Sequence, residues 1–128
     1  MRIKLSKQDI IFSKLIRERD KKCVFCERMD GKLECSHFWG RGNKATRFSP
    51  LNCDTLCFQC HANNEGNKQG FYREWKQAQL GSKRYVKLEK RARSTVPYGK
   101  YEKMLILVYL TNNGLDGMDG FLETLWKP

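Results

Sequence analysis

Cysteine and histidine are the residue types in this 128-residue chain best suited to chemistry, and most of them lie in one short stretch. Two Cys-x-x-Cys pairs lie at the ends of that stretch, namely Cys23, Cys26, Cys57 and Cys60. Each pair supplies two neighbouring thiolates, and four thiolates complete the tetrahedron that a structural Zn²⁺ prefers. The chain has two histidines, His37 and His61, and the zinc interpretation leaves both free for other chemistry.

Other interpretations of the cysteines are weaker. A thioredoxin-like redox pair needs a βαβ context that the sequence lacks. Disulfides are disfavoured because the segment MRIKLSKQDIIF is charged and is not typical of a secretory signal, so we expect a reducing, cytoplasmic setting. Cys35 and Cys53 have no partner at Cys-x-x-Cys spacing and are expected to be buried free thiols.

The charge of the chain indicates what the chemistry acts on. Lys and Arg number 25 against 14 Asp and Glu, which gives a formal net charge of +11. Such an excess on a small chain predicts salt-sensitive attraction to polyphosphates, and it favours nucleic acid over a merely soluble cationic surface. The longest apolar run, Met104 to Leu110, is far too short to span a bilayer, so no membrane partner is expected.

The first half of the chain is expected to mix helices and strands. Apolar spacing predicts a helix over 6–20, capped by Ser6 with Asp9 in the reciprocal capping position. Residues 21–38 are expected to form a small hairpin that ends in a strand over 33–38. Alternation along this strand places Leu33, Cys35 and His37 on one face and Glu34, Ser36 and Phe38 on the other.

A long irregular loop is predicted next, over residues 39–52. It carries Arg41, Lys44 and Arg47, and these basic side chains are candidates for binding a phosphate backbone. A brief strand around 54–56 should enter the second cysteine pair. A helix should then start near Cys60 or His61 and break at Gly66.

Beyond residue 70 the sequence predicts helices. One over 71–80 should stop at Gly81, and others are expected over 98–110 and 115–126. The segment 82–93 between them has charges all around the helix and little apolar surface to bury, which favours contact with a nucleic-acid backbone. The residues assigned to this contact are Lys83, Arg84, Lys87, Lys90 and Arg91.

The central motifs, taken in order, resemble a known enzyme family. They read LECSHF over 33–38, RFSPLN over 47–52 and LCFQCH over 56–61. This set resembles the HNH endonucleases of the ββα-metal (His-Me finger) superfamily, and it looks most like the zinc-knuckled phage branch that includes the NinG-type recombination proteins. The segment WKQAQLG over 75–81 and the basic helix after it resemble that branch more weakly.

The resemblance implies a fold and roles for individual residues. The fold would be α+β: a ββα-metal core with its zinc and N-terminal helix in residues 1–80, and a basic helical extension in 81–128 packed on the same domain. His37 would be the general base for phosphodiester hydrolysis, and Asn52 would orient it through its side-chain amide. His61, with Glu65 one helical turn later, would hold one catalytic divalent cation, Mg²⁺ or a transition metal.

The sequence departs from the family pattern at Ser36. Many HNH enzymes have Asp or His before the base as a metal ligand, and serine is a poor one. An alternative is therefore a non-catalytic zinc-knuckle module that binds nucleic acid or acts as a phage adaptor. The expected partner is duplex or branched DNA, in the host cytoplasm if the chain is phage-encoded, and the apolar C-terminal segment leaves a homodimer or a phage protein partner open.

Overall fold

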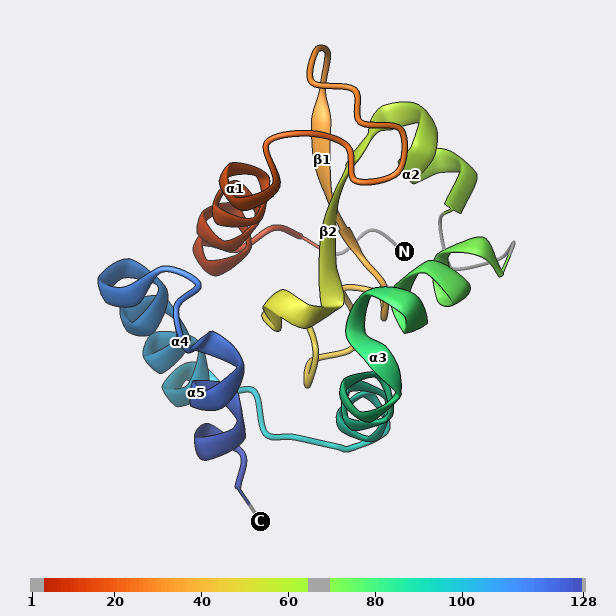
Figure 1. The fold of residues 1–128 in the computed structure, drawn as a ribbon. Helices are drawn as coiled ribbons and strands as arrows, with labels where there is room; N and C mark the ends of the chain where they lie inside the picture. The colour runs from red at the N-terminus through yellow and green to blue at the C-terminus, as the bar shows by residue number, and fades with distance from the viewer. Residues whose placement is uncertain (1–3, 65–69, 128) are drawn as a thin grey trace.

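A computed structural model describes residues 4–64 and 70–127 of the chain, and these residues form an α+β fold. Figure 1 shows a two-stranded sheet at the centre, with helices on both of its sides. The α+β class predicted from the sequence is confirmed. In chain order the elements are α1 (Lys7–Asp20), β1 (Leu33–His37), the 3-10 helix η1 (Pro50–Asn52), β2 (Cys53–Cys57), α2 (Phe58–Asn64), α3 (Phe71–Ala92), α4 (Lys100–Asn113) and α5 (Met118–Leu125).

The first helix forms where the sequence predicted it. The hydroxyl of Ser6 accepts the backbone N–H of Asp9, and the Asp9 carboxylate accepts the backbone N–H of Ser6, which completes a capping box. Phe12 and Ile16 bury one side of α1 against the sheet. The helix ends at Lys21, whose φ of 64° is left-handed.

The strand pairing differs from the predicted hairpin. Strand β1 pairs antiparallel with β2, with His37 opposite Cys53 and Leu33 opposite Cys57. The expected hairpin over 21–38 is therefore wrong, because residues 21–32 form turns that carry the first cysteine pair rather than a partner strand. A pairing between distant segments leaves no local signal, whereas the turn residues at 29–32 favour a hairpin that does not form.

The two faces of the sheet meet different helices. The hydroxyl of Thr55 donates to the carbonyl of Ile16, so the face shared by Cys35, His37, Cys53 and Thr55 meets α1. The opposite face, with Glu34 and Asp54, meets α2 and α3 (Figure 1). Helix α2 begins at Phe58, slightly before the predicted start, and the predicted break at Gly66 lies outside the described residues.

Helix α3 spans two helices that the sequence separated at Gly81. Gly81 has φ 79° and ψ 164°, so the helix kinks there but resumes immediately. A positive φ is easily adopted by glycine and costly for other residues, which explains why the bend lies at this position. The predicted end of the first helix at Gly81 is therefore confirmed, because the backbone leaves helical geometry there and a second helix follows within the segment labelled α3.

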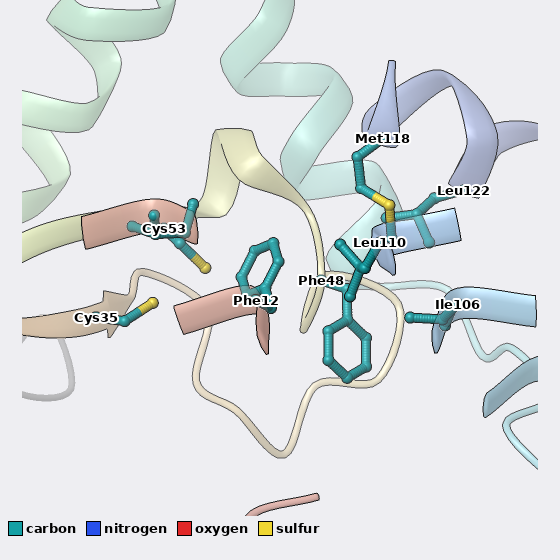
Figure 2. Close-up of a cluster of buried hydrophobic side chains, with 9 residues drawn as sticks. Phe12, Cys35, Phe48, Cys53, Ile106, Leu110, Met118 and Leu122 are labelled. Atoms are coloured by element: carbon teal, nitrogen blue, oxygen red, sulfur yellow. The ribbon is translucent and has the colours of Figure 1, made fainter. Parts of the chain in front are cut away.

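The C-terminal helices share a core with the sheet. Figure 2 shows Cys35 and Cys53 reaching towards Phe12 from the two strands, with Phe48 and side chains of α4 and α5 beyond it. Gln8 also joins α1 to α4, because its side-chain amide donates to the carbonyl of Lys103 at 2.8 Å. Among the described residues, none of the helices has the length and apolarity needed to cross a membrane.

Candidate functional site

The four cysteines of the two Cys-x-x-Cys pairs come together in space. We name Cys23, Cys26, Cys57 and Cys60 the four-cysteine cluster; their sulfur atoms all lie within 4.8 Å of one another. The backbone N–H of Val24 donates to the carbonyl of Thr55 at 2.9 Å, which docks the first pair beside the end of β2. The second pair joins the end of β2 to the first turn of α2.

The chemistry of the four-cysteine cluster fits a structural zinc. The Sγ atoms of Cys26 and Cys57 are 3.7 Å apart, a separation typical of two ligands on one tetrahedral ion. Burial would raise the pKa of the Cys23 thiol, but backbone hydrogen bonds around it lower that pKa to about 7. The cluster is therefore compatible with Zn²⁺, as the sequence predicted.

Cys35 and Cys53 are buried free thiols, as predicted, but they are not isolated. A ligand atom of His37 lies with both sulfur atoms in a group no more than 4.8 Å across. Sequence reasoning missed this group because it depends on the β1–β2 register. Burial and the neighbouring Cys35 raise the pKa of Cys53 well above its usual range, so this thiol stays protonated.

The imidazole of His37 has a defined hydrogen bond. Its Nε2 lies 3.0 Å from the carbonyl oxygen of Arg47, which can only accept, so Nε2 carries the proton and a neutral ring has its lone pair on Nδ1. Burial and the charge of Arg41 lower the pKa of His37 to about 4. The ring is therefore neutral near pH 7.

Arg47 does not lie where the sequence placed it. Its guanidinium is buried and makes two hydrogen bonds to the Asp9 carboxylate, at 2.9 and 2.5 Å. The prediction that Arg47 contacts nucleic acid is therefore corrected: its side chain is occupied inside the fold. Burial opposes ionisation of the Asp9 carboxyl, but the hydrogen bonds from Arg47 and Ser6 and the charge of Arg47 together outweigh it and hold the pKa of Asp9 below its usual range.

Asn52 is buried, but its amide does not contact His37. Its Oδ1 accepts the backbone N–H of Trp39, and its Nδ2 donates to the carbonyls of Trp39 and Thr46. These bonds fasten the loop that follows β1 at Trp39 and at Thr46. The expected direct contact between Asn52 and His37 is therefore wrong. Asn52 acts on His37 only indirectly, because it holds the loop that carries the carbonyl of Arg47.

His61 is paired with a carboxylate that the sequence analysis did not select. Its Nδ1 lies 2.8 Å from Oε1 of Glu34, and both side chains are partly exposed beside a small pocket at α2. Strand alternation places Glu34 on the face opposite His37, but no local pattern in the sequence links Glu34 with His61. Glu65, predicted as a second metal ligand, lies outside the described residues.

The side chain of His37 and the pair of His61 with Glu34 lie on opposite faces of β1. His61 reaches Glu34, which is three residues from His37 and on the other side of the pleat, roughly 10 Å along the strand. His61 lines the small pocket at α2, whereas His37 lines neither that pocket nor the larger hollow beside α3. The general-base and metal-binding roles that the resemblance implies for His37 and His61 therefore fall on opposite faces of the strand.

Asp54 and Ser36 add no free ligand on the α2 face. The Asp54 carboxylate lies 2.7 Å from the ammonium of Lys76 and 2.7 Å from the hydroxyl of Tyr72, and the side chains of Asp54 and Lys76 are fully buried. Ser36 is also buried. Among the described residues named here, this face therefore leaves His61 and Glu34 as candidate metal ligands.

The other predicted nucleic-acid contacts separate into two groups. Lys44, Lys83 and Lys90 are exposed, and Arg41 lies beside Asp9 with its Nε 3.9 Å from the carboxylate. The remainder are tied within the protein. Arg84 donates to the carbonyl of Leu80, Lys87 pairs with Glu123, and Arg91 pairs with Asp119 and Glu123.

Comparison of the chain with protein-family models, with curated proteins and with solved structures finds no match in any of the three.

Proposed function

We propose that this protein is a zinc-stabilised endonuclease of the HNH type, with a ββα-metal core, that hydrolyses phosphodiester bonds in DNA. The observation that carries the proposal is the hydrogen bond from Nε2 of His37 to the carbonyl of Arg47. It fixes the tautomer and leaves Nδ1 as an acceptor. A histidine held in this way at the end of a strand can take a proton from water.

The reaction assigned to His37 is a simple displacement. Nδ1 accepts a proton from a water molecule as the water oxygen bonds to phosphorus, and the bond from phosphorus to the 3′ oxygen breaks. The departing oxygen takes a proton from solvent. A pKa of about 4 makes the free ring a weak base, and the negative charge of a bound phosphate would raise that pKa towards neutrality.

His61 is the residue suited to holding a divalent cation. A histidine that ligates a metal commonly donates its other ring N–H to a carboxylate, and the bond from Nδ1 to Glu34 fits this arrangement, with Nε2 left for the ion. The ion would supply positive charge that stabilises the phosphate oxygens. Glu34 then acts as a positioning residue.

The proposal sets a requirement on where the phosphate binds. Because His37 and His61 approach from opposite faces of β1, the phosphate would lie along the edge of β1 that β2 leaves unpaired. Side chains from both faces of a strand can reach a group bound along its edge. Arg41, whose Nε is covered and has no hydrogen-bond partner among the described residues, lies close enough to His37 to lower its pKa.

Plasmid nicking tests the proposal. Supercoiled plasmid is incubated with the protein and Mg²⁺, Mn²⁺ or Ni²⁺, and wild type is compared with His37→Ala, His61→Ala and Glu34→Gln. We expect metal-dependent nicking that falls by about 10²-fold or more in His37→Ala. The exposed Glu27→Gln is the matched control for Glu34→Gln, and zinc content checks that each variant is folded.

A non-catalytic nucleic-acid-binding module is the second candidate. The opposite-face placement of the two imidazoles favours it, as does the burial of Ser36 where many HNH enzymes have a metal ligand. This function predicts DNA binding with no nicking in any of the three metals. It would also predict that His37→Ala binds DNA as tightly as wild type.

A further inference from the structure

A hollow of about 830 Å³ lies between the loop after β1 and one side of α3. Its lining includes Phe38, Trp39, Arg73, Tyr85, Glu89 and Arg93. The volume is in the range of small-molecule sites rather than of ordinary surface grooves. The predicted site residues do not include any of these six, so the hollow is a feature that sequence reasoning missed.

The hollow depends on the kink in α3. Gly81 lets the two halves of the helix run in different directions, as Figure 1 shows, so that Arg73 from the first half and Glu89 from the second line one space. The facing loop is held in place by Asn43, whose side-chain amide donates to the carbonyl of Ala92 at 2.7 Å. The space is therefore preformed.

Aromatic rings form one wall of the hollow. The centroids of Phe38 and Trp39 are 6.0 Å apart with their planes nearly perpendicular, and those of Phe38 and Tyr85 are also 6.0 Å apart. Phe38 and Tyr85 are mostly buried, whereas Trp39 is partly exposed. Base-on-aromatic stacking is a sequence-tolerant source of affinity for unpaired nucleotides.

The polar groups of the hollow match a nucleotide better than an apolar ligand. Arg73 and Arg93 are exposed, and guanidinium groups bind phosphate through paired hydrogen bonds. Glu89 lies 3.6 Å from Arg93 and can accept from an exocyclic amino group of a base. On the adjoining loop, the covered Nε1 of Trp39 has no acceptor among the described residues, so this donor could be satisfied by a ligand oxygen.

We propose that this hollow binds one unpaired nucleobase together with a flanking phosphate. A base inside a duplex is stacked on both sides, so an unpaired base is the one that can enter and stack. Phe38 and Trp39 directly follow His37 in the chain, with Phe38 on the face opposite His37, so the bound nucleotide would neighbour the phosphate assigned to the unpaired edge of β1. That last step rests on the proposed function, whereas the binding itself does not require catalysis.

Binding of short labelled DNA, followed by fluorescence anisotropy at one fixed salt concentration, tests this inference. The probes are an eight-nucleotide dC strand, the matching dT strand and a blunt duplex of two fully complementary strands. We expect wild type to bind the dC strand at least tenfold more tightly than the duplex, because the duplex offers no unpaired base. Equal affinity for the strand and the duplex would overturn the inference.

Two substitutions locate the binding. Val86 is 45% exposed in the wall of the hollow, and Val86→Glu should weaken dC binding about tenfold while changing duplex binding less than threefold. Val108→Glu is the matched control, because Val108 is 49% exposed on α4 outside the hollow, and it should leave both affinities within twofold. Equal losses for dC and duplex in Val86→Glu would show general charge repulsion and would contradict the inference.

The preference between bases tests the role of Glu89. Cytosine has an amino group that can donate a hydrogen bond to Glu89, and thymine has none. Wild type should therefore prefer dC to dT about tenfold. Glu89→Gln should reduce this preference to less than threefold, and the exposed Glu74→Gln should keep it. Base binding is measured without added divalent metal, where no cleavage is expected, so failed nicking and failed base binding are separate outcomes.

Discussion

The Nε2 atom of His37 lies 3.0 Å from the main-chain oxygen of Arg47, and a buried ion pair holds that oxygen in place. The guanidinium of Arg47 is bound by Asp9, and Asp9 also accepts the backbone N–H of Ser6 at the start of α1. The N-terminus of the first helix and the orientation of the candidate base are therefore parts of one hydrogen-bonded structure. A change in Asp9 should affect both stability and His37.

The Asp9→Ala substitution removes the partner of a buried arginine. An uncompensated buried charge typically costs about 3–5 kcal/mol, and the loss of the capping box adds to this, so the free energy of unfolding should fall by about that amount. Urea denaturation measures it. Glu18→Ala is the matched control, because Glu18 is exposed on the same helix and should change stability by less than about 0.5 kcal/mol. Similar midpoints for the two variants would contradict the assignment.

The low pKa of His37 gives the protein a stability that depends on pH. The pKa is about 4 when folded against about 6.5 in the unfolded chain, so between these values the unfolded state binds more protons. Stability from this residue is therefore complete above pH 6.5 and is lost as the pH falls to 4. We expect a loss of about 2 kcal/mol, reduced from the full shift because the ring is partly open to water.

Titration of Asp9 and of the cysteines is common to wild type and His37→Gln. Comparing the two proteins therefore isolates the pH dependence of stability that comes from His37. The difference in unfolding free energy between wild type and His37→Gln should change by about 2 kcal/mol between pH 7 and pH 4.5, in favour of the variant at low pH. A constant difference across this range would show that His37 titrates normally. Urea denaturation at several pH values gives the measurement.

Features set by neighbouring residues could be predicted from the sequence. The cap of α1 depends on Ser6 and Asp9, three residues apart, and the cysteine pairs depend on a local turn. Both were found where expected. The buried state of Cys35 and Cys53 also followed from their residue type and lack of local partners.

Features set by distant residues could not be predicted. Asp9 and Arg47 are 38 residues apart, so no local pattern indicates that the arginine is buried rather than exposed in a loop. The pair of His61 with Glu34 spans 27 residues and depends on α2 packing on the face of β1 that carries Glu34. The sequence therefore indicated which residues could form the site better than it indicated what each of their side chains contacts.

The four-cysteine cluster should bind one zinc ion per chain. Elemental analysis of purified protein should give about one equivalent, and Cys57→Ser should lose it and unfold, because four ligands close the site and metal binding contributes to folding. Cys53→Ala is the matched control. It removes a buried cysteine four residues away and should keep the zinc, at a cost in stability from the small cavity that it leaves. Zinc retained in Cys57→Ser would contradict the site.

Two kinds of basic residue on α3 should respond differently to substitution. Lys83 and Lys90 are exposed, so Lys83→Ala and Lys90→Ala should each weaken DNA binding without affecting stability and should reduce the salt slope by about one unit per lost phosphate contact. Arg91 instead donates to Asp119 at 2.9 Å and to Glu123 at 3.1 Å, joining α3 to α5. Arg91→Ala should therefore lower the unfolding free energy, by about 1–2 kcal/mol.

Titrations of a hairpin duplex at several salt concentrations separate the two effects. Lys14→Ala is the control for the lysines, because Lys14 is exposed on α1, far from α3 in the sequence. If the basic side of α3 contacts DNA, the salt slope falls in Lys83→Ala and Lys90→Ala and stays unchanged in Lys14→Ala. Equal slopes in all three variants would mean that attraction comes from net charge alone, because any lysine would then contribute alike.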